Sequence, residues 1–192
     1  MTQTFRTFVA IELEEAIRQR VASLIQKLAW VPADVKWVEP HNLHLTLKFL
    51  GDVEQGQIAR VCEAVARAAA EVPAFEFELR STGAFPNLGR PRTIWVGAGE
   101  GQQAVAELAR YIEKALEPLG YPREGRRFQA HLTIGRVRRG GPALAELADR
   151  LQALNDVELG RTAVEQVVVF SSRLSVSGPT YEALGRAALG GE

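Results

Sequence analysis

The chain runs twice through the same order of secondary structure, and this repetition limits its possible folds more than any other feature. Alternating apolar residues predict strands, and apolar residues three and four apart predict amphipathic helices. Residues 5–79 give the order strand, helix, strand, helix, strand, and residues 93–170 give it again. Because no Pro-, Gly- or Ser-rich linker separates these halves, we expect a single bilobal domain over residues 1–192, completed by a strand near Tyr181.

The predicted helices each carry one apolar face, and the predicted strands lie between them. The helices are Glu12–Trp30, Glu54–Ala70, Gln102–Leu119 and Pro142–Leu154. The strands are Phe5–Ile11, Leu43–Phe49, Phe75–Leu79, Thr93–Val96, Arg127–Val137 and Val164–Phe170. This alternation predicts an α+β fold of mixed layers with a pseudo-two-fold relation between its lobes.

The composition is that of a globular protein without a global charge. Of 192 residues, 46% are hydrophobic, and 23 basic residues balance 23 acidic ones. Zero net charge excludes attraction of the whole molecule to nucleic acid or anionic lipid, so any such preference must be local. One local excess lies between Arg123 and Arg139, where six arginines accompany a single acid, Glu124. The lone cysteine and the lack of a long apolar run lead us to expect a cytoplasmic protein with no membrane contact.

Two short motifs stand in matching places of the two halves. They are His-Leu-Thr-Leu at residues 44–47 and His-Leu-Thr-Ile at residues 131–134. Phe8 precedes the first histidine by 36 positions, and Trp95 precedes the second by the same 36. Each motif lies in an alternating strand, so each histidine shares the less apolar face with the threonine two residues on. In the first strand, alternation adds Lys48 to that face.

These motifs resemble those of the 2H phosphoesterase superfamily, and most of all those of its RNA 2′,3′-cyclic phosphodiesterases, once described as 2′-5′ RNA ligases. Residues 6–11, residues 37–43 and Arg136 are also similar to that family. The resemblance implies two β-sheet lobes that face a central cleft, with helices outside. It further implies that His44 donates a proton to the leaving 3′ oxygen and that His131 accepts one from water, which yields a 2′-phosphate.

The chemistry favours the same residue types without the resemblance. Opening a cyclic phosphodiester needs a base for the attacking water and an acid for the departing oxygen, and histidine can serve as either near neutral pH. The hydroxyls of Thr46 and Thr133 can donate to phosphate oxygens, and Arg136 can neutralise developing charge. Near-symmetry leaves the acid and base roles of His44 and His131 unassigned by the residues alone, and reverse ligation would exchange them.

Two further candidates depend on geometry that alternation does not settle. Simple alternation points Arg136 away from His131, and a bulge at Gly135 would re-aim it. Trp37 is a candidate for stacking on a base. Phe8 and Trp95 could also stack on a base, but aromatic residues in strands more often belong to the core, and we favour the core for all three.

Other functions remain as alternatives to hydrolysis of RNA ends. The same site would serve a small cyclic nucleotide or an ADP-ribose cyclic phosphate, and a non-catalytic module could bind RNA ends. The expected partner is an RNA, tRNA-like or oligonucleotide, with a 2′,3′-cyclic phosphate terminus. No Cys, Asp or Glu neighbours the motifs at ligand spacing, so we expect no metal and no cofactor. We also expect a monomer.

Overall fold

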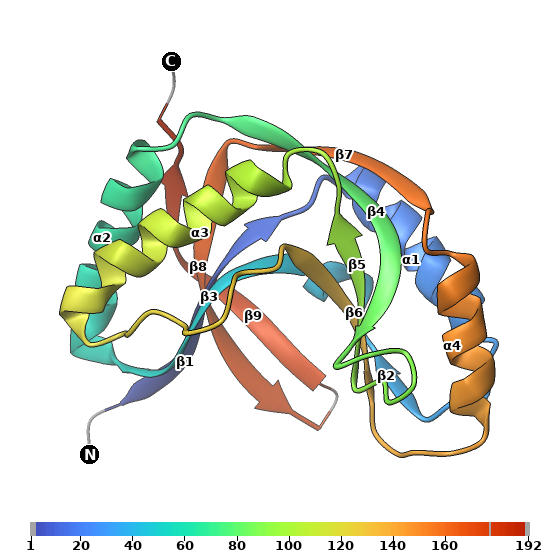
Figure 1. The fold of residues 1–192 in the computed structure, drawn as a ribbon. Coiled ribbons are helices and arrows are strands. Elements are labelled where there is room, and N and C mark those ends of the chain that lie inside the picture. Colours follow the sequence, from blue (N-terminus) through green and yellow to red (C-terminus); the bar gives the residue numbers. More distant parts are fainter. Residues whose placement is uncertain (1–2, 177, 191–192) are drawn as a thin grey trace.

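The computed structural model describes residues 3–176 and 178–190, whose strands form two antiparallel sheets with the α-helices outside them (Figure 1). The first sheet has the order β3-β1-β8-β9, and the second has the order β2-β6-β5-β4-β7. The strands are β1 Thr4–Glu12, β2 Val35–Trp37, β3 His44–Glu54, β4 Phe75–Phe85, β5 Thr93–Ala98, β6 His131–Val137, β7 Glu158–Val164, β8 Gln166–Ser175 and β9 Gly178–Ala188. The α-helices are α1 Glu15–Leu28, α2 Ile58–Ala70, α3 Gln102–Leu116 and α4 Ala143–Ala153. The α+β fold class is therefore confirmed.

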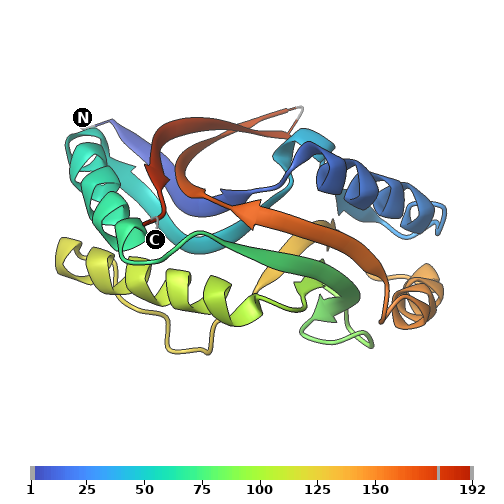
Figure 2. The same cartoon turned by 90° about the horizontal axis from the view of Figure 1, so that it is seen from above.

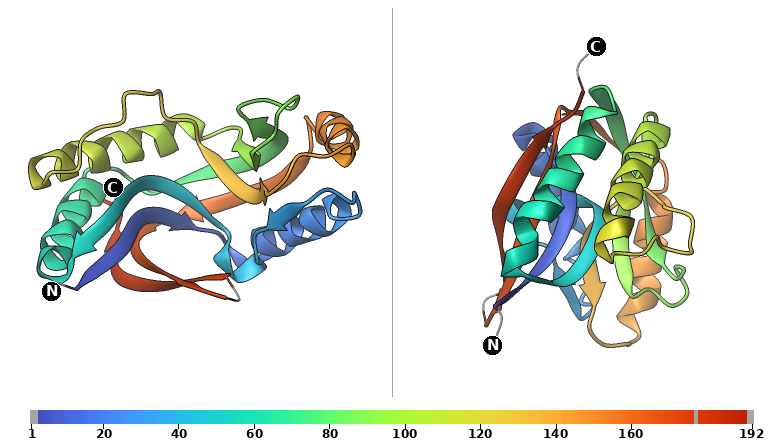
Figure 3. Two further views of the ribbon diagram at one scale, coloured as in Figure 1. Left: turned by 90° about the horizontal axis from the view of Figure 1, so that it is seen from below. Right: turned by 90° about the vertical axis from the view of Figure 1, so that its left-hand side faces the viewer.

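The helices cover opposite ends of the two sheets. Helices α2 and α3 lie side by side at one end, and α1 and α4 lie at the other (Figure 2). The same grouping is visible from below and from the side (Figure 3). Apolar faces of these helices and of both sheets join in one core cluster. None of the helices in the described residues is both long and apolar enough to cross a membrane.

Each sheet takes strands from both predicted halves. Strands β8 and β9 from the second half complete the sheet of β1 and β3, while β2 and β4 from the first half join the sheet of β5, β6 and β7. The prediction of one strand at Val164–Phe170 was wrong. Strand β7 ends at Val164 and pairs with β4, and β8 begins at Gln166 and pairs with β1. The chain changes sheets at Glu165, and the two polar residues Glu165 and Gln166 inside an apolar run do not reveal such a crossing.

Several predicted strand ends differ from the observed ones. Strand β2 was missed because three residues are too few to show a period. Strand β4 continues to Phe85, beyond the predicted end at Leu79, through a bulge where Ser81 has a positive φ of 62°. That bulge breaks the alternation on which the prediction relied.

A β-bulge follows each histidine at the same distance. In β3, Ala10 of β1 pairs with Thr46 and Val9 pairs with Lys48, so the intervening Leu47 has no partner. In β6, Trp95 pairs with Thr133 and Ile94 pairs with Gly135, so the intervening Ile134 has none. Both unpaired residues come three positions after the histidine, and both bulges invert the alternation of the residues that follow.

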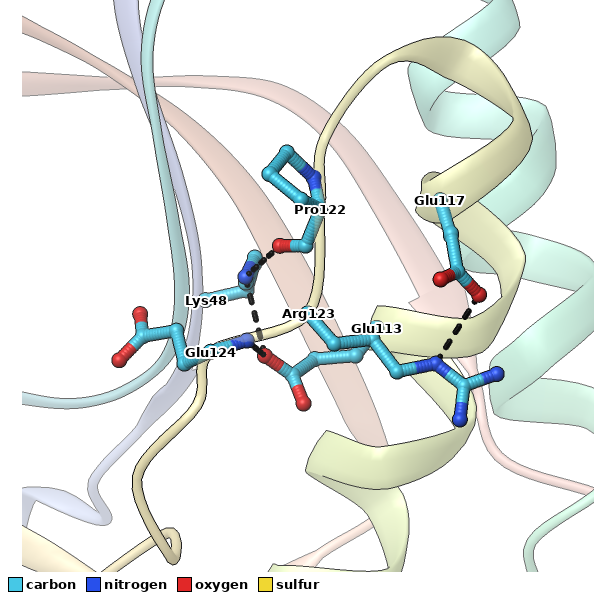
Figure 4. Close-up of polar contacts among 6 residues, drawn as sticks. All are labelled: Lys48, Glu113, Glu117, Pro122, Arg123 and Glu124. Atoms are coloured by element: carbon cyan, nitrogen blue, oxygen red, sulfur yellow. Dashed lines mark hydrogen bonds and ion pairs between the residues drawn. The ribbon is translucent and has the colours of Figure 1, made fainter.

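The first bulge corrects the expected position of Lys48. This side chain lies in the interior with 4% of its surface exposed, and it does not share the face of His44. Its Nζ donates hydrogen bonds to Oε1 of Glu113 at 2.9 Å and to the carbonyl of Pro122 at 2.7 Å (Figure 4). The backbone N–H of Glu124 donates to the same Oε1 at 3.0 Å. This Lys48–Glu113 latch ties the strand of His44 to helix α3 and to the segment that leads to His131.

Replacing Lys48 by Met should destabilise the protein, because the substitution leaves the Glu113 carboxylate with one hydrogen bond in a mostly buried site. We expect the free energy of unfolding to fall by about 2–3 kcal/mol, measured by urea denaturation. Arg123→Ala is the matched control. It removes an ion pair to Glu117 whose two side chains are about half exposed, so its effect should stay below about 1 kcal/mol. Equal effects of the two substitutions would contradict the role of the latch.

Candidate active site

His44 and His131 are the first residues of β3 and β6, strands that contact each other across the two sheets. Each imidazole is held in the same way: Nδ1 lies 2.7 Å from a backbone carbonyl two residues earlier, that of Asn42 or Gln129. A carbonyl oxygen only accepts, so Nδ1 carries a proton and donates it. In the neutral ring Nε2 is then the free basic nitrogen, which is the atom left for a ligand.

The carbonyl that orients His44 is itself anchored to the neighbouring strand. Asn42 is buried in the short 3₁₀ turn Pro40–Asn42, and its side-chain amide donates to the carbonyl of Pro179 in β9 at 2.9 Å. His41, in the same turn, is exposed. The turn therefore leaves His41 exposed to solvent and fixes the carbonyl of Asn42, which holds His44.

The two imidazoles share one charged neighbour. Burial is the main cause that lowers the pKa of His44 and of His131, the backbone hydrogen bond raises each in part, and the positive charge of Arg136 lowers both. The same charge also lowers the pKa of Tyr181, which burial raises more strongly. Strands β3 and β6, which begin with these histidines, contact each other, and the charge of one guanidinium acts on both imidazoles.

The second bulge explains the position of Arg136. Because Ile134 is unpaired, the alternation inverts and Arg136 joins the face of His131 and Thr133, where Nη1 lies 3.5 Å from Oγ1 of Thr93. Simple alternation would have placed it on the opposite face. We call the face that carries His44 on the first sheet, or His131 on the second, the histidine face of that sheet.

Thr46 and Thr133 occupy the histidine faces, as alternation predicts. Thr46 pairs with Ala10 and Thr133 pairs with Trp95, and both threonines are partly buried. Within residues 3–176 and 178–190, neither hydroxyl has a protein hydrogen-bond partner. A hydroxyl at this position can donate to a phosphate oxygen.

Aromatic rings surround both imidazoles. Around His44 the ring centroids of Phe8 and Tyr181 lie 4.8 and 5.2 Å away. Phe8 belongs to a small apolar cluster on the histidine face of the first sheet, separate from the main core, with Ala10, Val168 and Phe170. On the second sheet, Phe85 lies edge-on to His131 at 5.0 Å. These apolar neighbours exclude water from the imidazoles and account for the desolvation that lowers their pKa values.

The structure does not bring Trp37 to this site. Trp37 packs on the core face against Gly135, where an added Cβ would lie 2.8 Å from the indole. Trp95, interpreted from the sequence as a core residue, instead lies on the histidine face beside Thr133. Sequence reasoning also missed Tyr181 and Phe85 as neighbours of the histidines. For Trp95 a signal existed, because its equivalence to Phe8 and the parity of its strand both place it beside the motif.

The described residues contain no group of three or more His, Cys, Asp or Glu side chains that could hold a metal ion. The groups gathered at this site are instead two imidazoles, two hydroxyls and one guanidinium. Together they can move two protons and balance the charge of one anion.

Known proteins are similar to this chain in both sequence and fold. An RNA 2′,3′-cyclic phosphodiesterase of Archaeoglobus fulgidus is 36% identical over 93% of this chain and 97% of its own. A protein of the same name from Methanothermobacter thermautotrophicus is 37% identical over 92% and 94%. Among solved structures, TT0787 of Thermus thermophilus superposes with a TM-score of 0.81 at 30% identity, covering 97% of this chain and 99% of its own.

A structure of E. coli LigT with 3′-AMP has a TM-score of 0.77 at 24% identity over 97% and 99%, and so shows the same fold. The LigT-like phosphoesterase family matches twice, at residues 11–95 and 96–181. Each match contains one of the two histidine motifs. With matches that span nearly the whole sequence, the chain belongs to the LigT-like phosphoesterase family.

Proposed function

We propose that this chain hydrolyses the 2′,3′-cyclic phosphate at the end of an RNA to a 2′-phosphate. The observation that carries the proposal is the shared environment of His44 and His131: each offers Nε2 to a ligand, and both lie near the charge of Arg136. Relatives that cover almost the whole chain bear the name RNA 2′,3′-cyclic phosphodiesterase, which supports this substrate.

Two proton transfers complete the reaction. Water attacks phosphorus and gives a proton to Nε2 of His131, while the bond from phosphorus to O3′ breaks and O3′ takes the proton of Nε2 of His44. The reaction leaves His44 neutral and His131 protonated, and exchange with solvent resets both rings. Thr46 and Thr133 donate to the non-bridging oxygens, and Arg136 offsets their charge. Because the imidazoles supply both proton transfers, the scheme has no step for a metal or cofactor.

With an RNA 5′ hydroxyl in place of water, the same groups would join that RNA to the cyclic phosphate in a 2′-5′ linkage, with His131 again taking the proton of the nucleophile and His44 again protonating O3′. The histidines would exchange roles only in the cleavage of that 2′-5′ linkage. A product assay distinguishes the proposal from its alternatives. An RNA with a cyclic phosphate end should yield a 2′-monophosphate. Turnover of small cyclic nucleotides alone would indicate the small-molecule alternative, and binding without turnover would indicate an RNA-end-binding module.

We also propose that the chain is one duplicated domain that acts as a monomer. Three features that recur in both halves support a duplication: the element order, the bulge three residues after the histidine, and the hydrogen bond from the histidine to a carbonyl two residues earlier. Each sheet contains strands from both halves, so an isolated half would lack strands that its sheet needs. This argues that neither half folds alone.

Removing either imidazole should abolish most of the turnover. We expect His44→Ala and His131→Ala each to lower kcat by roughly 10²–10⁴-fold. The double variant should be little worse than the poorer single, since both groups serve one transition state. His41→Ala, on the exposed turn beside the site, is the control and should retain full activity. Additive losses, or an active His44→Ala variant, would refute the two-histidine mechanism.

Removing the charge of Arg136 should shift the pH profile in a defined direction. Its charge lowers the pKa of both histidines, so Arg136→Gln should raise both pKa values. Both limbs of the bell-shaped dependence of kcat/KM on pH should then move to higher pH. Histidine titration by NMR checks the shift without turnover. Arg138→Gln, an exposed neighbour on the same strand end, should leave both limbs in place, and a shift in that variant would argue against a specific effect.

Valine at Thr46 or Thr133 keeps the β-branched shape and removes the hydroxyl. Because each hydroxyl is proposed to donate to a charged phosphate oxygen, we expect kcat/KM to fall by about 10- to 100-fold. The melting temperature should change little. Thr4→Val, at an exposed position of β1, controls for the substitution itself. A large loss of melting temperature accompanying the loss of activity would show that the hydroxyls are structural.

A further inference from the structure

Lys36 and Arg136 lie directly opposite each other in neighbouring strands. Lys36 is the middle residue of β2, and its register partner in β6 is Arg136. Residues directly opposite in an antiparallel pair share one face of the sheet, and Arg136 is on the histidine face. The position of Trp37 on the core face agrees, because alternation then turns its neighbour Lys36 to the other face. The second sheet therefore carries two cations side by side on its histidine face.

Neither cation has an acidic partner. In the part of the chain that the structure describes, no carboxylate lies within ion-pair distance of Lys36 or Arg136. Asp34, two residues before Lys36, lies 3.8 Å from Arg139 instead. Like charges directly opposite each other destabilise a pair of strands. An arrangement that costs stability in the free protein indicates an anionic ligand that offsets both charges.

The reacting group supplies only one of the two negative charges. A 2′,3′-cyclic phosphate is a diester with a single charge, and Arg136, whose own charge lowers the pKa of both imidazoles, balances it. Lys36 lies one strand further out, on β2 at the edge of the sheet, and its side chain is exposed. A second anion is needed to match it. In an RNA the nearest one is the phosphodiester on O5′ of the same terminal nucleoside.

A contact with the first sheet places the ammonium group of Lys36 between the two sheets. A Cβ built on Gly178, the first residue of β9, would lie 3.7 Å from Nζ of Lys36. The hairpin of β8 and β9 reaches the turn before His44, where the carbonyl of Pro179 accepts the hydrogen bond of Asn42 (Figure 3). Lys36 thus extends from β2 to a strand of the other sheet, beside the turn that holds His44.

We propose that Lys36 binds the phosphodiester on the 5′ side of the terminal nucleoside, so that the site distinguishes the end of an RNA from a free nucleoside cyclic phosphate. This inference rests on the proposed function and adds a second phosphate subsite to it. A phosphate contact carries no base identity, so the subsite favours RNA ends of every sequence. Lys36 contributes binding and no proton transfer, so its removal raises KM and leaves kcat unchanged.

The test compares ligands that differ by one phosphate. Calorimetry measures binding of adenosine 2′-monophosphate and of adenosine 2′,5′-bisphosphate. Turnover is measured on adenosine 2′,3′-cyclic phosphate and on the dinucleotide ApA with the same cyclic end. Lys36→Gln should weaken bisphosphate binding and raise KM for the dinucleotide by about 5- to 30-fold, as for one charge-assisted hydrogen bond at an exposed site. Both values for the ligands without a 5′ phosphate should stay within about twofold.

Salt dependence and matched variants separate an effect of charge from an effect on structure. In Lys36→Gln the slope of log KM against log salt concentration for the dinucleotide should flatten by about 0.7, the value for one phosphate of a single strand. Lys36→Arg keeps the charge and should retain the preference for the dinucleotide. Lys27→Gln, at an exposed position of α1 outside the sheets, is the control and should change none of these values. Melting temperatures confirm that each variant is folded.

The outcomes separate the two proposals. Unchanged bisphosphate binding in Lys36→Gln, or equal losses for ligands with and without the 5′ phosphate, would overturn the second phosphate subsite. A wild-type protein that prefers the bisphosphate through Lys36 and yet turns over neither cyclic phosphate would refute the proposed hydrolysis and leave the subsite standing.

Discussion

Two β-bulges, one after His44 and one after His131, give the site its composition. A regular strand would keep every second residue on one face, so the histidine, the threonine and the residue five positions after the histidine could not share that face. One unpaired residue inverts the pattern. In β6 this places Arg136 beside His131, and in β3 it turns Lys48 into the interior, where Glu113 neutralises it. The bulge in β6 thus places Arg136, the cation of the site. The bulge in β3 places Lys48 in the buried Lys48–Glu113 latch.

The two lobes repeat one plan with different side chains, and the differences define the site. Five positions after the histidine, the second lobe has Arg136 and the first has Phe49, so one guanidinium serves both imidazoles. Phe8 is covered by other aromatic rings, whereas its equivalent Trp95 is partly buried and packs against Gly83 and Gly97. A symmetric frame therefore holds an asymmetric surface.

The electrostatics of the site favour neutral histidines before substrate binds. Burial and Arg136 lower both pKa values, while the hydrogen bonds from Nδ1 to backbone carbonyls oppose that shift in part. An anionic phosphate beside Arg136 would offset the guanidinium charge and make protonation of one imidazole easier. Substrate binding and the appearance of the general acid would then be coupled through Arg136. The same coupling explains why the pH profile is the most direct readout of this residue.

Local sequence patterns were enough to predict the order of elements, the duplicated register and the faces of His44, Thr46, His131 and Thr133. A strand's period of two assigns each residue to a face without knowledge of its partners. The folded chain was needed to show which sheet each strand joins, where the alternation inverts, and which tryptophan stands beside the site. Strand pairing and bulges depend on partners far along the chain, so Arg136, Lys48 and Trp37 could not be placed by periodicity. The glycines that leave room for Trp95 come from its own strand and from the neighbouring β4, and only folding shows that they meet.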